Sequence, residues 1–384
     1  MNYILEFLLY RPRVYSGLDH LMVELARQAT RDGNRVVCVY CDSMDGMPAL
    51  QADIAEAGGV VEVIRSSKKK MLVDIWHLYR KYRPQAVDTH FVQVAKIYTA
   101  LLSRVLGVKH FTHEHSLLGD DVQQYIRTKG RIKRIGLGLY YWLLTRWSKQ
   151  VFCISEAIHR QYLLWSYGHC RNVQTLYIGT QIVEPRYTRS EARERLHIPN
   201  DAKVLTNISA IEPIKGIDII LQAVALLKQQ GQEWLFVHIG GLRSDTAEQR
   251  DYAESLRTMA EQLGIAENVR WLGRRTDVQD ILPMADIYVH PSRSEGLGSV
   301  LMEAAVAHLP LIGTRVGGIP EIIHEGETGL LVPTDDAEAL AQAVMTMEKD
   351  KVRIGGGAYE YVRSQFNQKK QAEVMYGMYD STSC

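Results

Sequence analysis

Residues 294–304 read SEGLGSVLMEA and follow a strand-like run, DIYVH, at residues 286–290. A Pro-Ser break separates the two runs, and two glycines then open an apolar segment of helix-forming residues. Backbone N–H groups at the start of such a helix form an anion site, and glycines let a phosphate approach closely. The stretch therefore predicts a strand, a phosphate-binding turn and a helix, which is the repeating unit of a parallel α/β fold.

Two glutamates flank this turn. Glu295 precedes the glycines, and Glu303 lies about one turn inside the predicted helix. Carboxylates on both sides of one phosphate pocket suit a ligand with hydroxyls on both sides of a diphosphate, such as a nucleotide-sugar. The glycine turn alone also fits a purely structural connection, and Glu303 also fits an ordinary first-turn acid favoured by the helix dipole. The rest of the sequence favours the functional interpretation.

The composition is that of a globular protein whose 384 residues suffice for two domains with separate cores. Residues 3–10 are apolar, but the run is short and lacks a basic start, which predicts a first strand and not a signal peptide. No apolar stretch is long enough to cross a bilayer. Cys38 and Cys41 have a CxxC spacing without a second pair for zinc, so we expect reduced thiols in a cytoplasmic protein.

Charge is distributed unevenly along the chain. Residues 1–182 carry 24 Lys and Arg against 15 Asp and Glu, whereas residues 183–384 carry 21 against 29. A basic first half and an acidic second half indicate an anionic partner for the first half. The sequence predicts no nucleic-acid partner.

Strand-like and helical runs alternate throughout, which predicts two doubly wound, Rossmann-like α/β domains. We expect an N-terminal domain at residues 1–182, a C-terminal domain at 183–366, and a final helix within 367–384 that packs back toward the first domain. The predicted strands are residues 3–9, 35–41, 60–64, 86–90, 109–113, 150–154 and 173–177, then 203–208, 234–239, 268–272, 286–290 and 310–313.

Several predicted strands are followed by glycine or by a charged residue. Lys215-Gly216 follows the strand at 203–208, and Gly317-Gly318 follows the one at 310–313. A lysine there fits a phosphate contact, although alone it also fits a solvated side chain. Gly241 and Gly273 close two further strands. Because carboxyl ends of parallel strands meet at one edge of the sheet, these loops predict one phosphate-ligand site.

Together these features resemble the retaining glycosyltransferases of family 4, which have the GT-B fold. The resemblance rests on the E-x7-E element (Glu295 to Glu303), on Lys215-Gly216, on the Gly-Gly-x-Pro-Glu element at 317–321 and on the run at 325–333. It is close from about residue 204 to 336 and looser in the first half. The fold implied is two Rossmann-like domains facing a central cleft.

The resemblance implies a role for each donor residue. Glu295 binds hydroxyls of the donor sugar, Glu303 binds the ribose hydroxyls, and Lys215 helps the backbone N–H groups at the helix start to hold the diphosphate. Glu295, Lys215 and His113 are the expected catalytic residues. The full donor set adds Gly296, Leu297, Gly298, Ser299, Val300, Leu301, Gly17, Gly241, Arg243 and Arg274.

Two departures from the family pattern stand out. The family usually has an arginine about five residues before the lysine, where this chain has Ala210. Arg243 or Arg293 could supply the second phosphate charge, or donor binding is altered. The usual Asn-Gly near the domain join is Ile178-Gly179 here.

The first half matches the family in weaker form. Residues 16–20 match the glycine loop after the first strand, reduced to Gly17, and Asp19 in that loop is expected on the acceptor side. Residues 111–115 match the strand-end histidine motif that faces the reacting sugar. We transfer that role to His113 and keep His115 as a further acceptor-side candidate, although a strand-end histidine can also be an ordinary loop residue.

Retention of configuration can use a carboxylate nucleophile in a double displacement. The resemblance instead implies front-face transfer, in which the leaving phosphate helps deprotonate the acceptor hydroxyl and the protein supplies positioning and charge. The chain has no Asp-x-Asp, the pattern that many metal-dependent transferases use. We therefore predict metal-independent transfer with no cofactor.

Residues 127–149 suggest a membrane-facing helix. They contain seven basic residues and no acid, interleaved with apolar and aromatic ones. This pattern suits an anionic membrane interface, and it also fits an ordinary helix with a solvated basic face. The basic residues are Arg127, Lys129, Arg131, Lys133, Arg134, Arg146 and Lys149.

The sequence thus predicts a retaining glycosyltransferase that moves a sugar from a UDP- or GDP-sugar to a hydroxyl of a glycan or lipid-linked saccharide, in cell-surface polysaccharide synthesis. The protein would be cytoplasmic and peripheral on the inner face of the cell membrane. Two alternatives stay open: a GT-B nucleotide-sugar epimerase or hydrolase, and a non-catalytic nucleotide-sugar-binding partner of another transferase.

Overall fold

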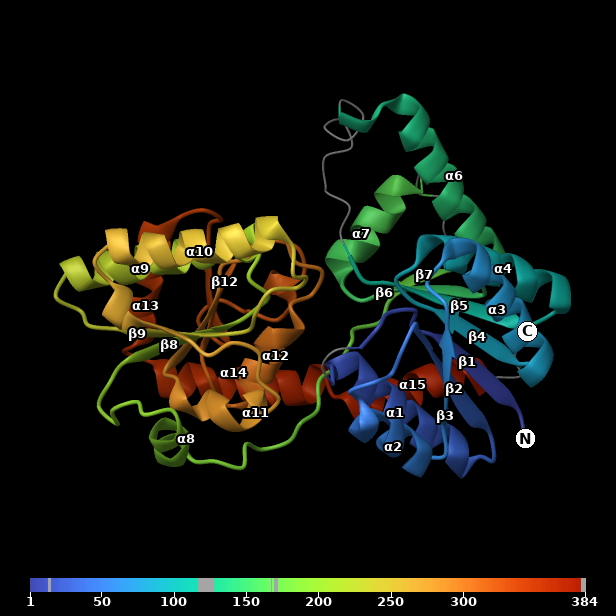
Figure 1. The fold of residues 1–384 in the computed structure, drawn as a ribbon, viewed down its shortest axis with the longest axis horizontal. Helices are drawn as coiled ribbons and strands as arrows, with labels where there is room; N and C mark the ends of the chain where they lie inside the picture. Colours follow the sequence, from blue (N-terminus) through green and yellow to red (C-terminus); the bar gives the residue numbers. More distant parts are fainter. Residues whose placement is uncertain (13–14, 117–127, 167, 169–171, 381–384) are drawn as a thin grey trace. The chain divides into compact units, whose positions relative to one another are not determined.

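The computed structural model describes residues 1–12, 15–116, 128–166, 168 and 172–380. The chain divides into two compact units. Unit 1 comprises Met1–Gln181 together with the chain from Gln368 onward, and unit 2 comprises Ile182–Asn367. Each unit is built on its own parallel sheet flanked by helices (Figure 1). The predicted fold of two doubly wound α/β domains is confirmed.

Unit 1 contains a seven-stranded sheet in the order β3-β2-β1-β4-β5-β6-β7, with neighbouring strands parallel. Its strands are β1 Tyr3–Phe7, β2 Arg35–Cys41, β3 Val60–Ile64, β4 Ala86–Thr89, β5 Lys109–Glu114, β6 Gln150–Cys153 and β7 Val173–Thr175. Its described helices are α1 Gly17–Arg31, α2 Pro48–Glu56, α3 Lys68–Tyr82, α4 Gln93–Leu106, α6 Arg131–Trp147, α7 Glu156–Trp165 and α15 Gln368–Asp380.

Helices cover both faces of this sheet. α1 packs against α2 and α15, whereas α4 packs against α3 and α6. Figure 1 shows the two groups on opposite sides of the strands. The strands are consequently buried on both faces, which explains why β2 reads as a nearly continuous apolar run.

The start of α1 follows from its sequence. The side chains of Ser16 and Asp19 form a capping box, in which the Asp19 carboxylate accepts the Ser16 N–H at 2.9 Å. Leu18, Leu21 and Leu25 recur at helical spacing and are buried against the sheet. These residues explain why the chain forms α1 from Gly17 to Arg31.

The last helix, α15, belongs to unit 1 and is anchored there by hydrogen bonds. The Gln371 side chain accepts the Gly179 N–H at 2.6 Å, and the Asn34 amide donates to the Tyr376 hydroxyl at 2.9 Å. Tyr379 is fully buried in the same unit. The end of the chain thus contributes side chains to the core of the first domain.

Unit 2 contains a six-stranded parallel sheet in the order β10-β9-β8-β11-β12-β13. Its strands are β8 Val204–Ile208, β9 Leu235–Ile239, β10 Val269–Trp271, β11 Ile287–His290, β12 Leu311–Thr314 and β13 Gly329–Val332. Its α-helices are α8 Arg189–Arg195, α9 Ile217–Gln229, α10 Ala247–Gln262, α11 Val278–Ile281, α12 Ser299–Val306, α13 Ala337–Met347 and α14 Lys351–Gln365. The sequence missed β13.

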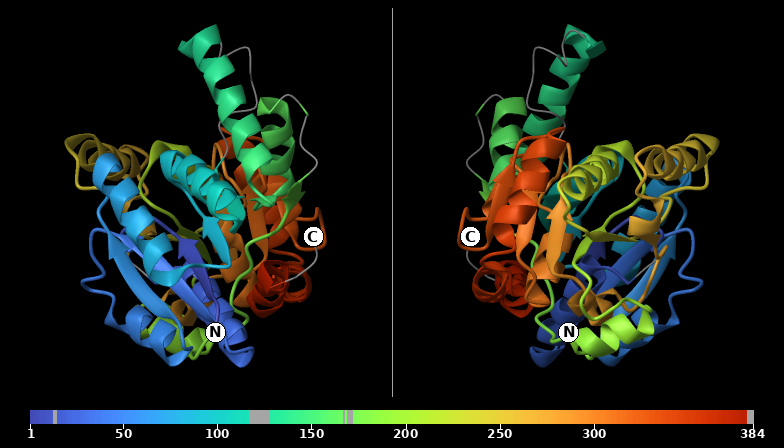
Figure 2. Two further views of the ribbon diagram at one scale, coloured as in Figure 1. Left: turned by 90° about the vertical axis from the view of Figure 1, so that its right-hand side faces the viewer. Right: turned by 90° about the vertical axis from the view of Figure 1, so that its left-hand side faces the viewer.

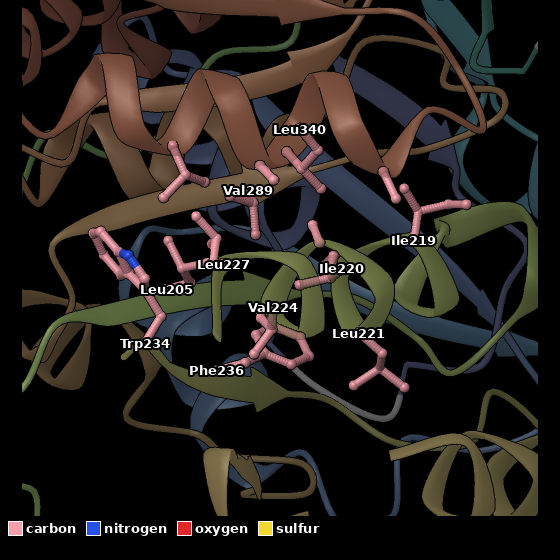
Figure 3. Close-up of a cluster of buried hydrophobic side chains, with 14 of the residues drawn as sticks. Leu205, Ile219, Ile220, Leu221, Val224, Leu227, Trp234, Phe236, Val289 and Leu340 are labelled. Atoms are coloured by element: carbon pink, nitrogen blue, oxygen red, sulfur yellow. The ribbon is translucent and has the colours of Figure 1, made fainter. Parts of the chain in front are cut away.

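The core of unit 2 fixes the strands whose ends carry the candidate site. Ile220 and Val224 of α9 and Leu340 of α13 pack with Leu205 of β8 and Val289 of β11 (Figure 3). Fully burying one such side chain contributes about 1.5–3 kcal/mol. Because β8 and β11 share this core, the loops that follow them are held at one place.

The helix α6 differs from the other helices of unit 1. Both views in Figure 2 show it reaching away from the sheet, with α7 beside it. Among the described residues, no helix is both long enough and apolar enough to span a bilayer. The surface of α6 is described with the site below.

Candidate active site

The predicted donor residues of unit 2 lie at the carboxyl ends of its two central strands. β8 and β11 pair with each other, and the sheet continues to β9 on one side and to β12 on the other. Ligands of open parallel sheets bind at such a switch point. The loop after β8 carries Lys215, and the loop after β11 carries Glu295.

The two loops meet at Gly216. Its φ is +66°, and a Cβ added there would lie 2.1 Å from the carbonyl oxygen of Pro291. Only glycine fits both conditions. The backbone N–H of Arg293 also donates to the Ile214 carbonyl at 2.8 Å. These contacts hold the lysine loop against the glutamate loop.

Glu295 is the centre of a charged cluster. Its Oε2 lies 2.6 Å from Nζ of Lys215, 3.1 Å from Nε2 of His290 and 3.4 Å from Oγ of Ser292. Burial by itself would raise the pKa of Glu295, but hydrogen bonding to His290 and the Lys215 charge outweigh it and lower the pKa to about 2. Glu295 is therefore ionised at neutral pH.

The helix α12 starts beside this cluster. Gly298 precedes it with a left-handed φ of +89° and has no side chain to cap the first turn. The N–H of Leu301 bonds to the Gly298 carbonyl at 2.9 Å, whereas the N–H groups of Ser299 and Val300 belong to the uncapped helix end. Such a helix start favours an anion.

The glycine loop after β12 supports the same turn from the other side. A Cβ added at Gly318 would lie 2.5 Å from the carbonyl oxygen of Gly296 and 2.7 Å from Cα of Leu297. The N–H of Gly318 also bonds to the Glu295 carbonyl at 3.3 Å. The Gly-Gly-x-Pro-Glu element therefore allows a close approach that fixes residues 295–297.

Glu303 lies one turn into α12, in a different environment from Glu295. Burial raises its pKa to about 7. Among the described residues, none forms a hydrogen bond or ion pair with its side chain, in contrast to the three partners of Glu295. A ligand hydroxyl that donates to Glu303 would stabilise its charged form.

The two arginines considered in place of Ala210 have different surroundings. Arg293 holds both oxygens of Asp218, at 2.7 and 3.1 Å, and its Nε lies 2.6 Å from Asp335. It braces the loop, so its assignment as a phosphate cation is corrected. Arg243 is more exposed and lies 3.5 Å from Glu212, and it remains a candidate.

A pocket of about 490 Å³ lies at the ends of β8, β9 and β10, lined partly by Gly240, Gly241 and Gly273. The backbone of Gly240 approaches Ser209 so closely that an added Cβ would lie 1.8 Å from its carbonyl oxygen. Gly241 packs against Arg274, with 3.2 Å from an added Cβ to Cγ. The predicted donor residues Gly241 and Arg274 are thus neighbours.

In unit 1, the loop after β1 places its two predicted residues differently. Gly17 opens α1, and nothing lies within 4 Å of a Cβ added there. Asp19 is fully buried, and its oxygens accept hydrogen bonds from Tyr10, Tyr40 and Ser16 at 2.5, 2.9 and 2.6 Å. Asp19 therefore holds the loop together, which corrects its assignment to the acceptor side.

The two histidines of the β5 motif are also placed differently. His113 lies within β5, is 1% exposed, and has Nδ1 3.0 Å from Oδ2 of Asp88. The side chain of His113 is thus covered in this structure, and its role toward the reacting sugar stays a prediction. His115 lies just beyond the end of β5, is half-buried and stacks on Phe91 with 4.2 Å between ring centroids.

Acidic and histidine side chains cluster at the carboxyl ends of β4 and β5. Asp88, His90 and His113 each offer one metal-ligand atom, all within 4.8 Å of one another. Both nitrogens of His90, however, already have partners, because Nε2 lies 3.2 Å from Glu6 and Nδ1 lies 2.8 Å from His115. Hydrogen bonding thus accounts for His90, and we describe the cluster as a polar network.

Sequence reasoning missed four members of these clusters: His290, His90, Asp88 and Glu6. His290 ends β11 and His90 follows β4, so the strand-end rule that singled out Lys215 also covers them. Glu6 is a charged residue in an otherwise apolar strand, and a buried charge of that kind needs a partner. These signals were readable but were not used.

The basic helix of unit 1, α6, exposes apolar residues as well as basic ones. Ile132, Ile135, Leu139 and Trp142 of α6 recur at spacings of three and four and are 86%, 63%, 54% and 49% exposed. Arg134 is instead buried, and it donates to the Trp165 carbonyl at 2.9 Å. Its assignment to the basic surface is corrected, and the expected residue Arg127 lies outside the described residues.

Comparison with known proteins identifies the family. Residues 15–179 match the family described as Glycosyltransferase Family 4, and residues 188–368 match the one described as Glycosyl transferases group 1. The chain belongs to the family 4 glycosyltransferases. Two family patterns that each cover one unit agree with the resemblance drawn from the motif residues.

Curated relatives match part of the chain. The D-inositol 3-phosphate glycosyltransferase of Corynebacterium glutamicum is 34% identical over 193 residues, which are 48% of this chain and 45% of that protein. The N-acetyl-alpha-D-glucosaminyl L-malate synthase of Bacillus anthracis is 30% identical over 214 residues, 54% of each chain. The matched region thus spans about half the length of these relatives.

Solved glycosyltransferase structures match the fold over nearly the whole chain. HepE from Anabaena in complex with UDP-glucose superposes with a TM-score of 0.78 at 19% identity, covering 98% of this chain and 99% of that chain. Sucrose-phosphate synthase from Thermosynechococcus elongatus gives 0.77 at 20% identity, with 99% and 98% covered. At these identities the match establishes the GT-B fold alone.

Proposed function

We propose that this chain is a retaining glycosyltransferase that moves a sugar from a nucleotide-sugar to a hydroxyl of a glycan or lipid-linked saccharide. The observation that carries the proposal is the pairing of Lys215 with Glu295 beside the uncapped start of α12. A cation, a carboxylate and an anion-binding helix end together suit a sugar diphosphate. Glu303, one turn further, suits the ribose hydroxyls.

Donor binding would rearrange the charges of this site. The diphosphate would accept the N–H groups at the start of α12 and attract Lys215 away from Glu295. Glu295 would then turn from an ion-pair partner to an acceptor for hydroxyls of the donor sugar. Its low pKa keeps it an acceptor at neutral pH.

In the transfer step, charge develops on the leaving diphosphate as the bond to the sugar breaks. Lys215 and the α12 N–H groups are placed to stabilise that charge without moving far. The acceptor hydroxyl would give its proton to the leaving phosphate on the same face of the sugar, which retains the configuration. We propose that this chemistry needs no metal ion.

UDP is the first nucleotide to test, and GDP is the second. Support for UDP comes from the HepE structures, which contain UDP and UDP-glucose. The acceptor is less constrained, because the relatives' names describe acceptors as different as inositol phosphate and malate. Two observations support an anionic acceptor at the cell surface. Unit 1 is basic, and one relative is a lipopolysaccharide core mannosyltransferase.

We also propose that α6 rests on an anionic membrane. Its exposed apolar residues form a stripe along the helix, made up of Ile132, Ile135, Leu139 and Trp142. Contact between such an apolar stripe and water is unfavourable. The basic residues Arg131, Lys133, Arg146 and Lys149 are exposed on the same helix or directly after it. Apolar burial together with basic residues is the combination that binds anionic lipid surfaces. A lipid-linked acceptor in the same membrane would then lie close to the enzyme.

Donor binding tests the proposed function first. A panel of UDP- and GDP-sugars would be screened by thermal shift, since a ligand that binds only the folded state raises the melting temperature. The stabilising sugar nucleotide would then be incubated with saccharide acceptors and with none. Transfer to an acceptor supports the proposal, whereas isomerisation or hydrolysis alone supports the epimerase or hydrolase alternative.

Glu295→Gln supplies the matched variant, with Glu327→Gln as its control. Glu327 is an exposed acid in the loop before β13 and lies outside the charged cluster. We expect Glu295→Gln to abolish most transfer while Glu327→Gln transfers like the wild type. Donor binding without transfer in the wild type, across the acceptor panel, would instead support a non-catalytic binding partner.

A further inference from the structure

We propose that Glu6 and His90 are positioning residues that fix which ring nitrogen of His115 carries its proton. The three side chains form one hydrogen-bonded chain from the core of unit 1 to the end of β5. The inference rests on the proposed function and takes His115 as the acceptor-side candidate that contacts a substrate hydroxyl. It adds two residues that the donor motifs do not include.

The geometry of the chain is continuous. Glu6 on β1 and Asp88 on β4 are register partners, and His90 follows the end of β4. Oε2 of Glu6 lies 3.2 Å from Nε2 of His90, and Nδ1 of His90 lies 2.8 Å from Nε2 of His115. Glu6 and His90 are fully buried, so water does not compete for these contacts.

A neutral imidazole has one N–H and one acceptor nitrogen, so the chain has two self-consistent states. If Glu6 is protonated, it donates to His90, His90 donates to His115, and His115 keeps its proton on Nδ1. If Glu6 is ionised, every bond reverses, and His115 keeps its proton on Nε2. Nδ1 of His115, which lies outside the chain, is therefore a donor in the first state and an acceptor in the second.

The surroundings favour the first state. Burial and the negative charge of Asp88 raise the pKa of Glu6 well above its ordinary value, although Tyr379 acts in the other direction. Burial and the nearby His113 lower the pKa of His90 to about 3, so His90 is neutral. The raised pKa favours the protonated form of Glu6, and with Glu6 protonated the Nδ1–H of His115 is a donor.

A second arm of the cluster shares the Tyr379 hydroxyl with the first. Asp88 accepts that hydroxyl at 2.5 Å and lies 3.0 Å from His113, and Tyr379 also hydrogen-bonds to Glu6. The ammonium of Lys96 bonds to the His113 carbonyl at 2.5 Å and pairs with the half-buried Glu114 at 2.9 Å. Among the described residues, the hydrogen bonds from Glu6 through His90 lead to His115.

A donor at Nδ1 of His115 fits front-face transfer. In that reaction the leaving phosphate takes the acceptor proton, so the protein does not need His115 as a base. An N–H aimed at a sugar hydroxyl or at the leaving-group oxygen would instead fix the sugar and stabilise developing charge. The Nε2–H tautomer would instead present the Nδ1 lone pair to that oxygen and repel it.

The test combines nitrogen NMR of ¹⁵N-histidine-labelled protein with steady-state kinetics. Neutral histidine tautomers give different ¹⁵N shifts, and the His115→Gln variant assigns the His115 signals. Glu6→Met removes the first group of the hydrogen-bonded chain, and His90→Leu removes the middle one, since neither new side chain can donate a hydrogen bond and the Met thioether accepts one only weakly. Glu6→Gln retains an amide N–H that can donate to His90 as the protonated acid does. Ser148→Ala is the control, because it removes a buried hydrogen bond to another histidine, His110, at 2.9 Å.

We expect the wild type and Glu6→Gln to hold the Nδ1–H tautomer of His115, and Glu6→Met and His90→Leu to shift toward Nε2–H. In these two variants kcat should fall about tenfold or more while the donor KM stays within about twofold, as expected when only a catalytic tautomer is lost. Ser148→Ala should change neither quantity.

If the His115 tautomer is unchanged in both folded variants, Glu6→Met and His90→Leu, the inference is overturned. It is also overturned by a fall of kcat in Glu6→Met no larger than that in Ser148→Ala. The NMR measurement does not require turnover, so the two proposals can fail separately. A tautomer shift in a protein without transferase activity would support the hydrogen-bonded chain and overturn the proposed function alone.

Discussion

Nζ of Lys215 lies 2.6 Å from Oε2 of Glu295, so the two residues neutralise each other in the absence of a ligand. A diphosphate at the start of α12 would compete with Glu295 for that ammonium. The ion pair therefore keeps the site organised while it is empty, and ligand binding exchanges one anion for another.

Lys215→Met should weaken UDP binding and lower kcat, because the variant removes the cation that the diphosphate would take over. A charge-assisted hydrogen bond is worth about 1.5–3 kcal/mol, so we expect a loss of that order in calorimetry. Lys228→Met is the control, since Lys228 contacts the Gly264 carbonyl at the far end of α9. Equal affinity in the wild type and Lys215→Met would remove Lys215 from the phosphate site.

Glu295→Gln should reduce turnover much more than it reduces the affinity for free UDP. The reason is that Glu295 is assigned to the donor sugar, which free UDP lacks. The affinity for free UDP should not fall, since the variant releases Lys215 from its ion pair. Calorimetry with UDP alongside initial rates with the sugar nucleotide separates the two effects. A large loss of UDP affinity would place Glu295 against the nucleotide instead.

Glu303→Gln should stabilise the empty protein at alkaline pH and weaken UDP binding. Burial raises the pKa of Glu303 to about 7, above the value near 4.3 expected in the unfolded chain. The wild type therefore loses stability as pH rises from about 4 to 7, and the full penalty, on the order of 3 kcal/mol, is present above pH 7. Below pH 4 both forms are neutral and the difference vanishes.

Urea unfolding of the wild type and Glu303→Gln at several pH values measures this difference. Glu327→Gln, at an exposed loop acid, controls for the general effect of removing a carboxylate. A difference in unfolding free energy that stays constant from pH 4 to 8 would contradict the buried, unpaired environment described for Glu303.

Transfer should continue after chelation with EDTA. The proposed charge stabilisation comes from Lys215 and the α12 N–H groups, which do not depend on a metal. Initial rates would be measured before and after dialysis against EDTA, and then with added Mg²⁺ or Mn²⁺. Loss of activity that either ion restores would show that the metal-free mechanism is wrong.

The α6 surface should bind anionic vesicles. Wild-type protein should sediment with them and be released as salt rises, because salt screens the basic residues. Replacing Arg131, Lys133 and Arg146 with glutamine, or Leu139 and Trp142 with serine, should reduce sedimentation while UDP affinity is kept. Arg134 is left in place, because its buried contact with Trp165 makes it a folding residue. Equal binding to neutral and anionic vesicles would refute the electrostatic part of the claim.

Much of the fold could be predicted because strands buried on both faces read as short apolar runs. β2 and β9 were found for that reason. β13 was missed because its four residues follow a turn-rich stretch that had been interpreted only as a family motif. The sequence predicted Lys215 and Glu295 at one site because both follow strand ends, but it did not predict that they pair with each other.

Side-chain direction could not be predicted in the same way. His113 and His115 are two residues apart, and the sequence does not show where β5 ends. Residues two apart share one face of a strand, and the two histidines differ because β5 ends at Glu114, between them. Asp19 and Arg293 were likewise misassigned, because their partners Tyr40 and Asp218 are distant in the chain or belong to another element.

The anomeric configuration of the product tests the central claim most directly. The stabilising sugar nucleotide and its acceptor would be incubated with the wild type, and the anomeric proton coupling of the new glycoside would be read by NMR. The account predicts that the product keeps the configuration of the donor. An inverted product would contradict the proposed mechanism and the roles assigned to Lys215 and Glu295.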